Sequence, residues 1–127
     1  MAPTKLPRLY TTAQGSLILV GRNAVQNEQL TASALGTDMW FHCLDVPGSH
    51  VILRARSEHD LVSRADMVMA AELALFYSQA PDKYNGYVEY CKARHVAKVP
   101  GSKTGEVIAV NTTCMRIRNS RVEAVLL

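Results

Sequence analysis

Two histidines and one serine flank a Pro47-Gly48 pair in the first half of the chain. Side chains of these types can act as nucleophile, general base or metal ligand. A Ser-His-Asp triad needs hydrogen bonds formed in space, and the chain has no Gly-x-Ser-x-Gly motif around Ser49. Successive side chains of a strand point to opposite faces, so His42 and Cys43 are poorly placed to bind one zinc ion. The pattern therefore indicates no catalytic residue, metal or cofactor. If His42 and His50 converge at the surface of a sheet, an imidazole there can stack on a base or donate to a phosphate.

A second polar group lies where a strand is expected to end and a helix to begin. Arg22 and Asn23 occupy this junction, so the guanidinium of Arg22 and the amides of the first helical turn can hold one phosphate. The side-chain amides of Asn23 and Asn27 offer donors and acceptors to the 2′-hydroxyl groups that distinguish RNA from DNA. The alternative is that Asn23 only caps the helix and that Asn27 faces solvent.

The positive charge of the chain is concentrated in one segment. A net charge of +3 and an isoelectric point near 8.9 are only a mild bias toward polyanions. Residues 92–103 contain no acid and carry Lys92, Arg94, His95, Lys98 and Lys103. We expect Lys98 and Lys103 to hold phosphates without reading base sequence, with Arg94 beside them; the alternative is a solvated basic face. Gly101–Thr104 is not a P-loop, because no glycine directly precedes the lysine.

The strands and helices that must position these residues follow one another unevenly. Two strands with a turn at Gln14-Gly15 are expected within residues 10–20, and further strands at 38–44, 49–54, 87–90, 95–99, 106–110 and 114–118. One helix is expected from Ala24 to Leu35, ended by Gly36. This order differs from alternating βαβ units and predicts an α+β fold: a mixed, mostly antiparallel sheet with two helices packed on it and one face free for a ligand.

The second helix is expected to begin at a capping box over Ser57–Asp60. Its buried face is predicted from helical spacing as Leu61, Ala65, Val68, Met69, Leu73 and Phe76. One of Trp40 and Phe41, on the strand at 38–44, is expected in the core, and neither is assumed to stack on a base.

Length and composition bound the class of protein. The 127 residues suit one domain, 1–127, with its core at about 10–118. Three widely spaced cysteines, Cys43, Cys91 and Cys114, give neither a disulfide framework nor a zinc motif. No signal peptide and no apolar run long enough for a membrane span is present in this sequence. We therefore expect a cytoplasmic location and no membrane partner.

Several segments together resemble the NFACT-R domain, the RNA-binding domain of the NEMF/RqcH ribosome quality-control family. The resemblance covers roughly residues 10–118 and lies in Gly21–Thr31, Asp38–His42, Val46–Val51, Met69–Ser78, Val88–Tyr90 and Val96–Gly105. It implies a standalone, non-enzymatic domain that binds tRNA or tRNA-bearing ribosomal particles, including the large subunit.

The residues and the resemblance together predict one RNA-binding surface. Its members are Arg22, Asn23, Asn27, His42, Ser49, His50, Arg94, Lys98 and Lys103. Two alternatives remain open: an accessory or catalytic module of an RNA-modification system, with an RNA-modifying enzyme or ribosomal protein as partner, and an adaptor that docks a protein on its sheet.

Overall fold

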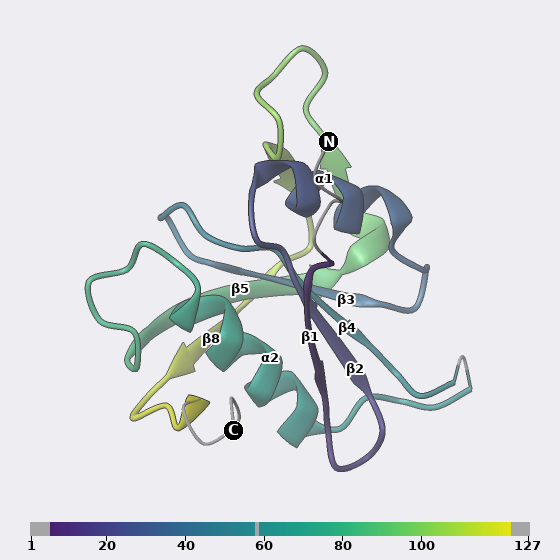
Figure 1. The fold of residues 1–127 in the computed structure, drawn as a ribbon, viewed down its shortest axis with the longest axis vertical. Coiled ribbons are helices and arrows are strands. Elements are labelled where there is room, and N and C mark those ends of the chain that lie inside the picture. Colours follow the sequence, from purple (N-terminus) through teal and green to yellow (C-terminus); the bar gives the residue numbers. More distant parts are fainter. Residues whose placement is uncertain (1–5, 58, 123–127) are drawn as a thin grey trace.

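A computed structural model of the chain describes residues 6–57 and 59–122, which form a six-stranded antiparallel sheet with helices on both faces (Figure 1). The strand order is β1-β2-β4-β3-β5-β8, and each neighbouring pair is antiparallel. These strands are β1 (Arg8–Thr11), β2 (Leu17–Val20), β3 (Met39–Cys43), β4 (Val51–Arg54), β5 (Gly86–Lys92) and β8 (Thr113–Ile117). The remaining elements are α1 (Ala24–Ser33), α2 (Arg64–Phe76), the 3₁₀ turn η1 (Ala93–His95), and the separate two-stranded hairpin β6 (Val96–Lys98) and β7 (Val107–Ala109). The predicted α+β class is confirmed.

Helix α2 covers one face of the sheet. Its residues Ala70, Ala71 and Ala74 are fully buried, and such small side chains allow the helix to approach the strands closely. Phe41 and Leu53 meet it from β3 and β4 and are also fully buried. This face carries the larger of two hydrophobic clusters.

Helix α1 and the β6–β7 hairpin lie on the other face. They pack on a smaller cluster formed by Leu30 of α1 with Trp40, Ile52 and Cys91 of the sheet. The two helices therefore lie on opposite faces, which corrects the expectation that one face is wholly free. The part of this face near β5 and β8 stays open, and Tyr87 there is 49% exposed.

The start of α2 differs from the prediction. Ser63, not Ser57, caps the helix by accepting a hydrogen bond from the amide of Asp66 at 3.0 Å. The sequence contains the Ser-x-x-Asp pattern twice, and the first copy closes a separate turn in which the Asp60 amide donates to the Ser57 carbonyl; Glu58, inside that copy, lies outside the described residues. The predicted buried face is wrong at its N-terminal end, since Leu61 is 96% exposed and Ala65 is exposed as well.

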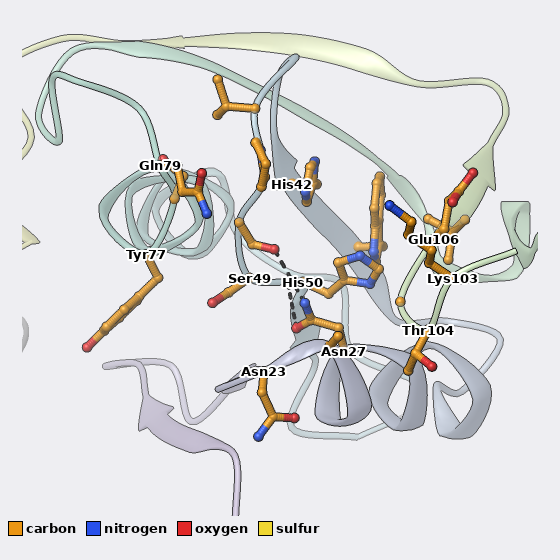
Figure 2. Close-up of a pocket in the computed structure, with 18 of the residues that line it drawn as sticks. Asn23, Asn27, His42, Ser49, His50, Tyr77, Gln79, Lys103, Thr104 and Glu106 are labelled. Carbon is orange, nitrogen blue, oxygen red and sulfur yellow. Dashed lines mark hydrogen bonds between the residues drawn. The ribbon is translucent and has the colours of Figure 1, made fainter.

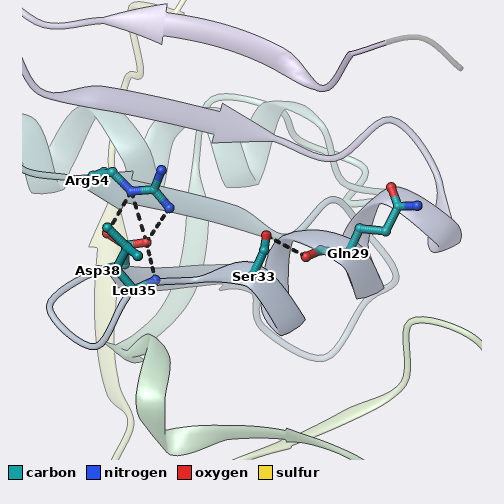
Figure 3. A network of polar contacts seen from close by, with 5 residues as sticks. All are labelled: Gln29, Ser33, Leu35, Asp38 and Arg54. Carbon is teal, nitrogen blue, oxygen red and sulfur yellow. Dashed lines mark hydrogen bonds and ion pairs between the residues drawn. The ribbon is translucent and has the colours of Figure 1, made fainter.

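The end of α1 also differs, because an ion pair with a buried carboxylate shapes the chain after it (Figure 3). The helix ends at Ser33 rather than Leu35, and Ala34 already has extended backbone angles. The amide of Leu35 donates to the carboxylate of Asp38 at 2.8 Å, and the fully buried Asp38 also accepts from Arg54 of β4 at 2.9 Å. A buried carboxylate is stable only with such partners, so the pair fixes the route from α1 into β3.

Candidate functional site

A cleft of about 920 Å³ opens where α1, the turn before β4, the end of α2 and the β6–β7 hairpin meet (Figure 2). Figure 2 shows Tyr77 and Gln79 of the α2 end on one side and Lys103 and Thr104 of the hairpin on the opposite side, with His50 between them. Seven of the nine predicted residues line this cleft: Arg22, Asn23, Asn27, His42, Ser49, His50 and Lys103. Arg94 and Lys98 are not among the lining residues.

Asn27 holds the base of the cleft in place through hydrogen bonds to the backbone. Its side-chain oxygen accepts from the amide of His50 at 3.0 Å, and its side-chain nitrogen donates to the carbonyl of Gly48 at 3.3 Å. Asn27 is 9% exposed, so the alternative that it faces solvent is wrong. Gly21 makes room for this arrangement, because a Cβ there would lie 2.0 Å from the Asn27 side-chain oxygen. Asn23 does cap α1, accepting from the amide of Gln26 at 2.9 Å, and stays exposed.

The Pro47–Ser49 turn is docked onto the end of α2. The amide of Ser49 donates to the carbonyl of Tyr77 at 3.1 Å, and the amide of Gln79 donates to the carbonyl of Pro47 at 2.9 Å. Gly48 does not adopt a positive φ. Glycine is needed there for close approach instead, since a Cβ would meet Ser78 at 3.0 Å.

Ser49 and His50 carry structural hydrogen bonds that define their chemistry. The hydroxyl of Ser49 donates its proton to the carbonyl of Gly21 at 2.7 Å and is not shared with a histidine. Thr31 donates its hydroxyl proton to the carbonyl of Asn27, so at 3.0 Å the Nδ1 of His50 is assigned as the donor to the Thr31 oxygen. Nε2 of His50 is then left as a hydrogen-bond acceptor.

Both histidines are poor cations in this setting. His50 is 4% exposed, and desolvation, with a smaller contribution from nearby His42, lowers its pKa to about 4. Desolvation also lowers the pKa of His42. The ring of His42 stacks on Trp40 with 5.8 Å between centroids, and it is nearly perpendicular to the ring of His50, with 5.5 Å between centroids. The two imidazoles converge as predicted, and at neutral pH they offer neutral polar edges rather than positive charge.

Charges of both signs border the cleft. Arg22 and Lys103 are exposed cations on its rim, and Arg22 also donates through Nε to the carbonyl of Leu6 at 2.7 Å. Asp45, Glu89 and Glu106 are carboxylates among the lining residues. The acid-free basic segment therefore meets acids supplied by other elements. Burial, and then the nearby charge of Asp45, raises the pKa of Glu89.

Lys98 and Arg94 lie apart from the cleft. The ammonium of Lys98 pairs with Glu28 of α1 at 3.0 Å, and the other carboxylate oxygen of Glu28 accepts from the amide of Gly105 at 3.2 Å. Lys98 therefore ties the hairpin to α1. Arg94 is exposed on η1.

Sequence reasoning missed three kinds of lining residue. Trp40 lies at the cleft although it is only 2% exposed, and its indole nitrogen has no hydrogen-bond partner among the described residues. Tyr77 and Gln79 come from the end of α2, and Glu89 from β5. No local pattern marks these positions; only the register that places Glu89 opposite His42 brings that pair together.

Within residues 6–57 and 59–122, no cluster of three histidine, cysteine or acidic side chains is arranged to hold a metal ion. The side chains of His42 and Cys43 point to opposite faces, His42 into the cleft and Cys43 into the cluster under α2. Neither helix in this part of the chain has the length and apolarity needed to cross a bilayer.

Comparison with known proteins shows a consistent set of similarities. The family model described as the NFACT protein RNA binding domain matches residues 7–111. The chain is 43% identical over 99 residues to the Rqc2 homolog RqcH of Bacillus subtilis (strain 168), covering 77% of this chain and 17% of that protein. It is 28% identical over 113 residues to ribosome quality control complex subunit 2 of Schizosaccharomyces pombe, covering 87% of this chain and 11% of that protein.

A solved structure has the same fold. The C-terminal part of the fibronectin/fibrinogen-binding protein from Streptococcus suis matches with a TM-score of 0.85 and 30% identity, over 98% of this chain and 50% of that chain. The chain thus spans about a fifth or less of the curated relatives it matches.

Proposed function

Because the chain belongs to the family of NFACT protein RNA-binding domains, we propose that it binds RNA in ribosome quality control, through the cleft between α1, α2 and the β6–β7 hairpin. The observation that supports this proposal is that the predicted residues lie close together in space. Residues far apart in sequence, from Arg22 to Lys103, line one cleft that was expected to be a single surface.

The two rim cations are suited to the RNA backbone. Arg22 can present a guanidinium fork to a phosphate, and Lys103 adds a point charge on the hairpin side of the cleft. The lining carboxylates leave no continuous basic groove, so phosphates are expected at the rim and sugars or bases inside. The neutral edges of His42 and the exposed amide of Asn23 are suited to sugar hydroxyls and base edges.

Within RNA, we propose tRNA or tRNA-bearing ribosomal particles as the ligand class. One relative is named ribosome quality control complex subunit 2, and another is named as a homolog of Rqc2. A folded RNA with unpaired nucleotides fits a cleft that offers few cations and several neutral polar groups.

Salt-dependent binding to a tRNA transcript tests this proposal. Arg22→Ala and Lys103→Ala should each weaken binding and lower the slope of log affinity against log salt by up to roughly one unit, since each removes one phosphate contact. The matched control is Arg64→Ala, which removes an exposed arginine at the far end of α2. Absence of tRNA binding by the unchanged protein at low salt, or an equal loss in the control, would contradict the proposal.

A further inference from the structure

The α1-side face of the sheet continues past the cleft onto β5 and β8, which run side by side (Figure 1). His42 pairs with Glu89 across β3 and β5, and Glu89 pairs with Cys114 across β5 and β8. Directly paired residues share a face, and so do residues two apart on one strand. Tyr87, two positions before Glu89, therefore lies on the same face as the cleft, opposite Arg116.

The side chains under α2 confirm this assignment of faces. Val88 and Tyr90 of β5 pack in the cluster beneath α2, together with Met115 and Ile117 of β8. The alternate residues of both strands must then point the other way. Tyr87 is 49% exposed, and the guanidinium carbon of Arg116 lies 5.9 Å from the centre of its ring.

The charge around this open face suits a polyanion. Residues 107–122 contain three arginines and no acid. Arg116 of β8, which is an edge strand of the sheet, and Arg118, directly after that strand, are both exposed. Asp45 and Glu89 line the cleft, and Glu89 is paired directly with Cys114 of β8.

We propose that unpaired nucleotides leaving the cleft cross this part of the sheet, with one base stacked on Tyr87 and the flanking phosphates held by Arg116 and Arg118. This inference rests on the proposed function and extends it, because the surface is continuous with the cleft through His42 and Glu89. An aromatic ring half exposed on a sheet, beside arginine, is a stacking surface for bases of any sequence.

The carboxylates of the cleft determine which part of the RNA strand faces the protein. Carboxylates repel phosphates but accept hydrogen bonds from the exocyclic amino groups of bases. Between the cleft and Arg116, the RNA strand is therefore expected to turn its bases toward Glu89 and its phosphates to solvent. Stacking on Tyr87 requires this same orientation.

The test compares two RNA probes: a hairpin with a short single-stranded tail and the same hairpin without a tail, the tail carrying one 2-aminopurine. The tail should increase the affinity of the unchanged protein. Tyr87→Ala should weaken binding of the tailed hairpin roughly tenfold, leave the tailless hairpin unaffected and abolish the quenching of 2-aminopurine. Tyr87→Trp should retain both the affinity and the quenching. Arg116→Ala should weaken only the tailed hairpin.

Leu61→Ala, a change at a side chain 96% exposed on another part of the surface, is the control for a general effect of removing exposed apolar groups. Thermal unfolding of each variant checks that the fold is intact. A tail that adds no affinity, or a Tyr87→Ala loss equal on both probes, would overturn this inference and leave the cleft proposal standing. Failure of the unchanged protein to bind either hairpin or tRNA would overturn both.

Discussion

At the scale of single residues, the cleft is assembled from polar groups that are already engaged with the backbone. The side-chain amide of Asn27 is hydrogen-bonded to the backbone of Gly48 and His50, and the hydroxyl of Ser49 donates to the carbonyl of Gly21. Buried polar groups of this kind must be satisfied within the protein. They therefore hold the shape of the cleft, while the exposed side chains of Arg22 and Lys103 remain accessible to a ligand.

His50 should make stability depend on pH. Its pKa of about 4 in the folded protein lies below the ordinary value of 6.5, so below pH 6.5 the unfolded chain binds a proton that the folded protein excludes. The free energy of unfolding should thus fall as the pH drops from 6.5 toward 4, by at most about 3 kcal/mol from this group. Urea unfolding across this range measures the loss, and His50→Gln should flatten the curve. His42 adds a loss of the same sign in both proteins, so parallel curves would contradict the assignment to His50.

Gly21→Ala should destabilise the fold through a defined contact. The added methyl group would meet the side-chain oxygen of Asn27, displacing it from the amide of His50. Loss of a buried hydrogen bond costs roughly 1–3 kcal/mol. Asn27→Ala removes the same contact, so the double variant should lose less stability than the sum of the two single changes. Chemical denaturation of all three variants gives the coupling, and strict additivity would show that the two residues act independently.

At the scale of elements, the predicted strands and α1 are close to those observed because their signals are local. The turn at Gln14-Gly15 joins β1 to β2, with Gly15 at a positive φ, and Asn23 caps α1 as its position suggested. The start of α2 was wrong because Ser57 and Ser63 offer the same capping pattern. In the second copy, Asp66 is buried and accepts a hydrogen bond from the hydroxyl of Thr12, 54 positions away. Such long-range contacts are invisible to local reasoning.

The attachment of the β6–β7 hairpin predicts a difference between its two lysines. Lys98 is paired with Glu28, and hydrogen bonding to Lys98 lowers the pKa of that carboxyl. Lys103 stands on the cleft rim. Lys103→Ala should therefore reduce the salt dependence of tRNA binding more than Lys98→Ala does. Filter binding at several salt concentrations measures both slopes, and Glu28→Gln serves as the control that removes the pair while keeping Lys98. Equal slopes for the two lysine variants would place Lys98 on the RNA as well.

At the scale of the whole molecule, one sheet connects two hydrophobic clusters that differ in size and partners. Trp40 and Phe41 are adjacent on β3, yet Trp40 belongs to the α1-side cluster and Phe41 to the α2-side cluster. The sequence indicated that one of them is buried, whereas both are. The second burial was not predictable, because it depends on α1 packing against the opposite face of the sheet from α2. The same holds for the cleft: its residue types were predictable, while the contributions of Tyr77 and Glu89 depend on tertiary packing.

The single-domain organisation predicted for residues 1–127 can be tested by comparing probes of the two clusters. Trp40 is the one tryptophan in the chain, and its fluorescence reports the α1-side cluster. Far-ultraviolet circular dichroism reports both helices, with the longer α2 contributing more. Because β3, β4 and β5 contribute side chains to both clusters, loss of one face should destroy the other. The two signals should therefore follow one urea transition with a common midpoint and slope, as expected for a cooperative domain. An earlier fluorescence transition would show instead that α1 and the hairpin unfold from a sheet still held by α2. Lys98→Ala should then widen that gap, because it releases the hairpin from Glu28.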